Sequence, residues 1–224
     1  MYEQPLRDMN INGVGSSSGG SFHRITLNGM ATINGDASCN SFRGSGTSKV
    51  KGSLTTPSAQ IDGTCSINGH LRAAQCRING MATVDGMLNS DTLETQGKLT
   101  VHRDCEAERV TINGMFSIDG LLNAGTIDAT ILGACRAREI GGESITVRQG
   151  RMNSFSRMVT SLFTSPYLEA DTIEGDEIVL EYTKARIVRG SMVVIGPGCE
   201  IDHVEYKVGL DVHNQAKVNR TTKL

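Results

Sequence analysis

The sequence has few aromatic residues and no tryptophan. Phe, Tyr and Trp make up 4% of the 224 residues, whereas glycine occurs 26 times. Large aromatic side chains supply much of the buried area in an ordinary globular core. Their scarcity, together with abundant glycine, favours a narrow core of small aliphatic side chains joined by many tight corners.

The chain also lacks a charge imbalance and a long apolar run. Its 22 Lys and Arg residues nearly balance 24 Asp and Glu residues, which gives no electrostatic case for nucleic-acid binding. No apolar run reaches the roughly 18–20 residues that span a bilayer. Residues 1–8 lack the basic and apolar regions of a signal peptide. We therefore expect a cytoplasmic protein that does not bind nucleic acid.

Motifs for metals, phosphates and catalysis are missing as well. None of the six cysteines forms a Cys-x-x-Cys pair, which argues against zinc and redox sites. No glycine-rich run has the spacing of a dinucleotide or phosphate loop. The histidines show no metal-ligand spacing and are expected to point outward: His23, His70, His102, His203 and His213. We expect no catalytic residue, no cofactor and no metal site.

What the chain does contain is a 17-residue repeat. Residues 112–120 read I-N-G-M-F-S-I-D-G, and related stretches begin at residues 27, 61 and 78. At this period the glycines form two columns, broken only by Arg103 in the second: Gly29, Gly46, Gly63, Gly80, Gly97 and Gly114, then Gly35, Gly52, Gly69, Gly86 and Gly120. A repeat this short predicts a solenoid, because each repeat packs only on its neighbours.

Between the glycine columns, apolar and polar residues alternate. One apolar column contains Ile33, Val50, Ile67, Val84, Val101 and Ile118, and polar residues precede each of them. Period two predicts short strands with one buried face. Asn-Gly and Asp-Gly pairs predict corners with positive φ. We predict an all-β fold, a parallel β-helix of triangular coils of about 17 residues. Four cysteines fall in its interior columns: Cys39, Cys65, Cys76 and Cys105.

Changes in this pattern divide the chain into five segments. Residues 1–24, rich in Gly and Ser, are expected to be a flexible lead-in, and residues 25–147 to form regular coils. Residues 134–140 resemble residues 104–110, and their separation predicts one regular coil and one shortened coil. Residues 148–167 interrupt the pattern, residues 168–212 resume it, and residues 213–224 are expected to be a mobile tail.

The interrupting segment has apolar residues at helical spacing and a local positive charge. Its candidate contact residues are Arg151, Phe155, Arg157, Val159, Leu162 and Phe163. A short amphipathic helix packed across the solenoid is one interpretation. A segment that binds a membrane surface or a partner protein is the other.

The two ends of the predicted stack have no recognisable cap. An uncapped coil exposes unpaired backbone N–H and C=O groups, which promote association. We expect the polymer interface to include Ile25, Leu27 and Ile33 in the first coil and Val204, Tyr206, Val208 and Leu210 in the last. Stacking that does not close into a ring produces filaments.

Part of the sequence resembles the bactofilins, which are bacterial cytoskeletal proteins. The resemblance rests on residues 99–101 and 107–114 and, in the longer Gram-positive-type members, on residues 173–178, 188–190 and 193–196. It implies a right-handed β-helix, assembly into non-polar filaments without nucleotide, and a scaffold role near the membrane. In that family the scaffold serves cell shape, the envelope or the motility apparatus. The partners so implied are the protein itself, a second bactofilin-like protein, the membrane surface or envelope and motility proteins.

Two other functions remain open at this point. Hexapeptide-repeat acyltransferases are also triangular β-helices, but the three steps of their coil are equal in length, whereas the third step of this repeat is shorter by one. They also use a catalytic histidine. A β-helix that binds partners without polymerising is the other alternative.

Overall fold

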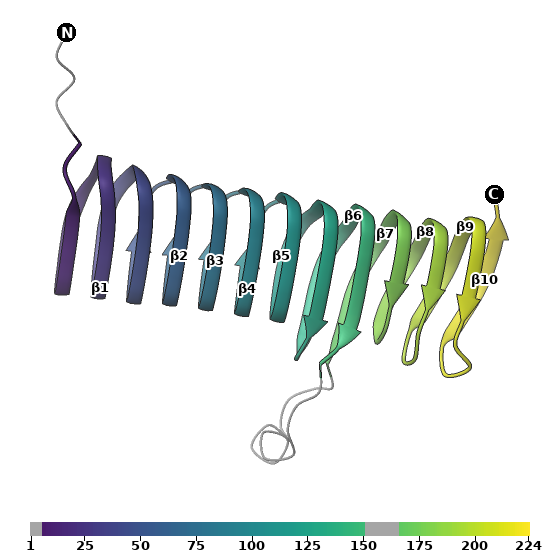
Figure 1. Ribbon diagram of the computed structural model, residues 1–224. Coiled ribbons are helices and arrows are strands. Elements are labelled where there is room, and N and C mark those ends of the chain that lie inside the picture. Colours follow the sequence, from purple (N-terminus) through teal and green to yellow (C-terminus); the bar gives the residue numbers. More distant parts are fainter. Residues whose placement is uncertain (1–5, 151–165) are drawn as a thin grey trace, which may run out of the picture. The chain divides into compact units, whose positions relative to one another are not determined.

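The computed structural model describes residues 6–150 and 166–224, and these residues form β-strands and connecting loops without any helix (Figure 1). The strands are β1 (Met9–Val50), β2 (Leu54–Ile67), β3 (Leu71–Val84), β4 (Leu88–Val101), β5 (Cys105–Ile131), β6 (Ala134–Gln149), β7 (Tyr167–Leu180), β8 (Thr183–Ile195), β9 (Glu200–Val212) and β10 (Lys217–Lys223). The chain divides into two compact units, Met1–Ala107 and Glu108–Leu224.

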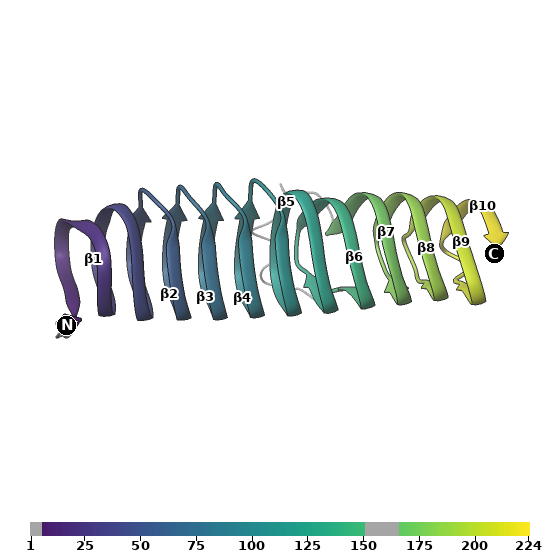
Figure 2. The ribbon, with the colours of Figure 1, turned by 90° about the horizontal axis from the view of Figure 1, so that it is seen from above.

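In the first unit, each coil lies directly over the preceding one. Leu54 pairs with Leu71 and Leu71 with Leu88, in parallel and at the spacing of the sequence repeat. Seen from above, β2, β3 and β4 run side by side with the same course (Figure 2). The fold is therefore a parallel β-helix with the period that the sequence predicts.

The interior of the first unit is built from the predicted apolar columns. Ile33, Val50 and Val84 are completely buried, and Ile67 is 1% exposed. The polar residues that precede them stay at least partly exposed, as period-two alternation requires. The four predicted interior cysteines of this unit are all buried.

Glycine stands in the two columns for different physical reasons. Every glycine of the first column has positive φ, from 96° at Gly46 to 154° at Gly114. In the second column only Gly35 does, so the positive φ predicted for the Asn-Gly and Asp-Gly corners is wrong for Gly69, Gly86 and Gly120. At Gly69 a Cβ atom would lie 2.7 Å from the backbone nitrogen of Ser53 in the preceding coil. Close approach of two backbones, rather than φ, excludes a side chain there.

The first coil begins earlier than the sequence predicts. Residues 9–24 belong to β1 and are not a flexible lead-in. Asn28 donates its side-chain amide to Asn12 at 2.8 Å, and Gly13 has φ of 87°. The corner at Gly13 precedes the corner at Gly29 by one residue less than the repeat period, and this difference obscured it in the sequence.

In the second unit the coils vary in length. Ser117 pairs with Arg136 across a long step, and after a bulge Leu122 pairs with Ile140 across a shorter one. The step from β7 to β8, where Leu168 pairs with Thr183, is shorter still. The predicted shortened coil before Ile140 is wrong, because Ile140 pairs with Leu122 and Ile127 pairs with Ile145.

The interrupting segment and the tail also differ from their predicted bounds. Strand β6 continues to Gln149 and β7 starts at Tyr167, while residues 151–165 lie outside the described residues. The predicted tail includes β10, which pairs in parallel with β9 from Lys217 to Lys223. Regular backbone pairing orders this segment even though it carries almost no apolar residues.

Candidate assembly edges and charged ladders

The three interface residues predicted for the first coil are in the core. Ile25, Leu27 and Ile33 are all completely buried. The coil formed by residues 9–24 precedes them, so the end of the stack lies elsewhere. Their assignment as surface contacts is wrong.

The outermost strand at this end is instead formed by residues 9–22, which we call the first-coil edge. No strand precedes it among the described residues, since residues 6–8 are irregular. Its sequence, M-N-I-N-G-V-G-S-S-S-G-G-S-F, has no charged residue and no proline, and Val14 is 79% exposed. Charges and proline are the usual protection of a strand edge against pairing, and this edge has neither.

The four residues predicted for the other interface differ in how exposed they are. Val204 is completely buried, Tyr206 and Leu210 are half-buried, and Val208 is 67% exposed. Strand β10 covers β9 from Glu200 to Tyr206, so Val204 is core. The outer strand is β10 itself, which we call the β10 edge (Lys217–Lys223).

The predicted membrane or partner residues, from Arg151 to Phe163, lie outside the described residues. In residues 6–150 and 166–224, no helix has the length and apolarity needed to span a membrane.

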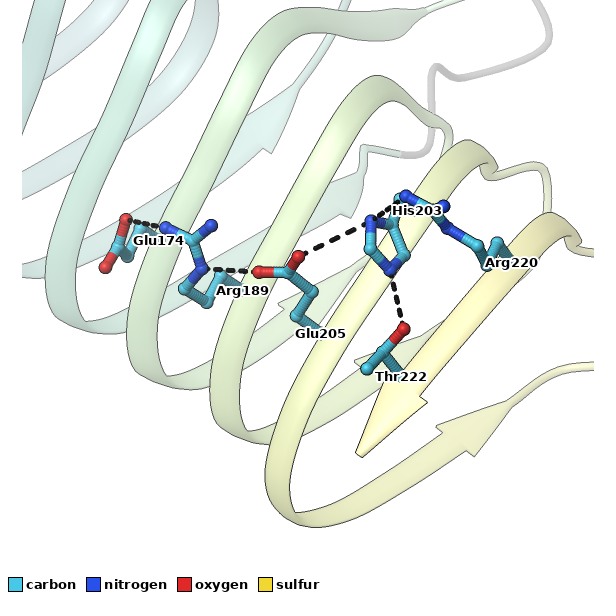
Figure 3. A network of polar contacts seen from close by, with 6 residues as sticks. All are labelled: Glu174, Arg189, His203, Glu205, Arg220 and Thr222. Carbon is cyan, nitrogen blue, oxygen red and sulfur yellow. Dashed lines mark hydrogen bonds and ion pairs between the residues drawn. The ribbon is translucent and has the colours of Figure 1, made fainter. Parts of the chain in front are cut away.

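A chain of ion pairs crosses β7, β8 and β9 (Figure 3). Arg189 on β8 contacts Glu174 on β7 at 3.1 Å and Glu205 on β9 at 2.6 Å. The side chain of Glu205 is only 18% exposed. The hydrogen bond and charge of Arg189 hold the pKa of the Glu205 carboxyl below its ordinary value, and the same contact raises the pKa of Arg189.

His203 continues this network and is the one histidine that is not mainly exposed. Its side chain is 12% exposed, with Nδ1 2.8 Å from the Arg220 guanidinium and Nε2 2.9 Å from the Thr222 hydroxyl (Figure 3). Because the guanidinium can only donate, Nδ1 accepts and Nε2–H donates to Thr222. The other histidines are exposed as predicted. His70, for example, accepts the Met87 backbone N–H at 3.0 Å.

A shallow groove of about 590 Å³ runs beside this network. Its lining includes Gly142, Gly175 and Gly190, which lie in one register column. Glu143 and Asp176 line its side. No cysteine or histidine lines it.

The six cysteines are buried and have no disulfide partner. Burial raises the pKa of Cys65 to about 11 and that of Cys76 to about 12. A thiol reacts as its thiolate, so these side chains are inert packing groups. In the described part of the chain, no cluster of three His, Cys, Asp or Glu residues could hold a metal ion.

The sequence analysis did not predict this column of alternating charges, which we call a charged ladder. Glu174, Arg189 and Glu205 stand in one register column, but each step between them is shorter than the repeat period of the first unit. An alignment at that period therefore does not place them together. Only an alignment that steps by 15 residues from Glu174 to Arg189 and then by 16 residues to Glu205 brings the alternating signs together.

Comparison with known proteins gives two relatives in Bacillus subtilis strain 168, both described as uncharacterised. YhbF is 42% identical over 87 residues, which is 39% of this chain and 34% of YhbF, so the matched region spans about a third of that protein. YhbE is 53% identical over 234 residues, covering 96% of this chain and 97% of YhbE. No family model matches the chain, and no solved structure matches it. The extent of the second match shows that this chain belongs to the family of YhbE.

Proposed function

We propose that this protein is a bactofilin-like cytoskeletal scaffold that self-assembles through its outermost coils without a nucleotide. The right-handed coil, the non-polar filament, the cytoplasmic location near the membrane and the service to cell shape, envelope or motility belong to this proposal. The β-helix itself is compatible with it, because stacked coils present a new strand edge wherever the stack stops.

The first-coil edge is the observation that carries the proposal. Its residues 9–22 offer a row of backbone groups with no charge and no proline to prevent pairing. Exposed Val14, at 79%, adds apolar area to that row. A second copy with the same edge would satisfy these backbone groups without placing like charges together. This contact joins two copies, and a filament needs a further contact at the β10 edge.

Electron microscopy of the purified full chain without nucleotide tests the proposal. We expect filaments or stacked particles, and we expect Ser16→Lys with Ser18→Lys to reduce them at least ten-fold. Both serines are exposed on the edge, and lysines facing lysines across the contact would repel. Circular dichroism should keep its strand signal, because neither side chain is buried.

The matched control places the same two charges on inner coils. Thr47→Lys with Gln96→Lys alters exposed residues of the first unit away from the edge and should leave assembly unchanged. Dispersed particles of the unmodified protein over a range of salt and pH would contradict the proposal. Assembly that survives the edge lysines would show that another surface is used.

A further inference from the structure

The second unit carries an outward column whose charge alternates from coil to coil. In register order it runs Arg136, Glu169, Lys184, Glu200 and Lys217. Lys184 contacts Glu200 at 3.3 Å. The Glu174, Arg189 and Glu205 column alternates in the same way. Opposite charges on neighbouring strands are favourable, and like charges directly opposite are unfavourable.

At the β10 edge, which is the outermost strand, the residue that ends the first of these columns is cationic. Lys217 has Glu200 on its inner side, and the Arg220 guanidinium contacts the ring of His203 at 2.8 Å. Three of the seven residues of β10 are cationic and none is acidic. Among the described residues, no further strand pairs with the outer side of β10.

Neither edge of this chain complements that pattern. The first-coil edge has no acidic residue between positions 9 and 22. A second β10, paired antiparallel about Arg220, would place Lys217 opposite Lys223 and Arg220 opposite Arg220. Both self-pairings therefore give the three cations no acidic neighbour on the outer side of β10, or place them against other cations.

We propose that the β10 edge accepts a strand of a different protein, one that carries acidic residues at three-residue spacing to face Lys217, Arg220 and Lys223. The contact continues the alternating column by one more coil and satisfies the outer backbone groups of β10. This inference rests on the register and charges of the second unit and not on the formation of filaments.

The test uses a charge-reversed copy of this chain as the acidic probe. The variant K217E/R220E/K223E presents carboxylates at all three positions, and antiparallel pairing with unmodified β10 would oppose every cation with an acid. Both proteins also carry S16K/S18K, so that the first-coil edge does not contribute. Sedimentation velocity measures the heterodimer in the mixture and each homodimer alone.

We expect the heterodimer to form at least ten-fold more tightly than either homodimer at low salt. Raising the ionic strength to 0.15 M shortens the screening length to about 8 Å and should weaken it several-fold. The matched control, K49E/R72E/K98E, makes the same change in net charge on exposed positions of inner coils. It should not associate with the unmodified β10 edge.

Each other outcome overturns the inference. Equal association of the control would mean general charge attraction, and no heterodimer would mean that the cations only shield the edge. Homodimers of the unmodified β10 edge that are as tight as the heterodimer would make a second copy the occupant. If circular dichroism shows that the triple variant has lost strand signal, K217E/K223E replaces it and leaves the contact of Arg220 with His203 in place.

Filament loss and heterodimer loss are separable results. Filaments of the protein with an intact first-coil edge report on the proposed scaffold function. The heterodimer in the S16K/S18K background reports on the β10 edge alone. Either result can be positive while the other is negative.

Discussion

The two units form the same kind of coil but differ in the regularity of its length and in the pattern of charge along it. In the first unit the steps from β1 to β4 are uniform, and glycines stand at fixed corners. In the second unit the step changes in length within β5–β6 and within β7–β10. There, side chains of opposite charge lie over one another. Both units contain ion pairs between neighbouring coils, such as Arg77 with Glu94 in the first, but columns that alternate in sign over several coils stand in the second.

The alternating charges disfavour a register error that identical repeats would allow. In a strict repeat, a strand that slips by one whole coil meets an equivalent set of residues. In the second unit such a slip would bring Glu169 against Glu200 and Lys184 against Lys217. Like charges opposite one another are unfavourable, so the correct neighbour is preferred even where coil length varies.

The largest expected effect is at a corner of the first unit. Gly80 has φ of 136°, and a Cβ atom there would collide with the carbonyl oxygen of Gly63. Positive φ costs a side-chain-bearing residue about 1–2 kcal/mol, and overpacking adds about 1–3 kcal/mol. We expect Gly80→Val to open the first unit, measured as alkylation of its four thiols before those of Cys135 and Cys199.

The matched control for this change is in the second unit. Gly141 has no positive φ, and its Cβ atom would first meet the ends of two side chains, Asn123 at 3.1 Å and Leu121 at 3.8 Å. Its register neighbours are Asn123 and Glu174, so the column accepts side chains. Gly141→Val should leave all thiols protected. Equal damage from both substitutions would mean that the units do not differ in this way.

Much of the first unit could be predicted because one residue type returns to one place at a constant period. Val50, Ile67 and Val84 are core as expected, and Gly80 is a corner as expected. The assembly residues Ile25 and Leu27 were misplaced for a specific reason. The corner at Gly13 falls one residue short of the period before Gly29, and a fixed period hid the coil that covers them.

The next effect in size should be a gain in stability. Thr95 is 1% exposed and occupies the core column of Ile61 and Ile78. Its hydroxyl oxygen is buried and has no hydrogen-bond partner among the described residues. A buried polar group without a partner costs about 1–3 kcal/mol. We expect Thr95→Val to raise the free energy of unfolding of the first unit by about that amount, measured in urea.

Thr56 provides the control for this prediction. It is equally buried, at 2% exposure, but its hydroxyl donates to the Ser58 carbonyl at 3.0 Å. Thr56→Val leaves that carbonyl with one partner fewer and should lower stability. The same sign for both substitutions would contradict the role assigned to the Thr95 hydroxyl.

The β10 edge and the ladders could not be predicted in the same way as the core. Arg189 and Glu205 are ordinary exposed-looking residues in the sequence, and only a register shorter than the main repeat brings them together. Val208 is exposed as a surface contact requires, but β10 was expected to be a mobile tail. Strand β10 forms through backbone pairing with β9. Residues Lys217–Lys223 include almost no apolar residues from which a strand could have been predicted.

The smallest expected effect comes from removing the centre of a ladder. Arg189→Met keeps the aliphatic stem and loses the contacts with Glu174 and Glu205. Ion pairs near the surface stabilise proteins only weakly, because water and salt screen them, and Arg189 is 40% exposed. We expect a small loss of stability of the second unit near neutral pH, with Lys184→Met as a single-pair control that loses less.

The pH dependence of that loss identifies its cause. Arg189 lowers the pKa of Glu205 from its ordinary value of 4.5, so the folded state binds this proton less tightly than the unfolded state. The stabilisation is present above pH 4.5 and disappears as the pH falls through the lowered folded pKa. The stabilities of Arg189→Met and the unmodified protein should therefore converge in acid, as followed by urea unfolding at each pH. A constant difference from neutral pH down to acid would mean that the arginine stem, and not its charge, stabilises these coils.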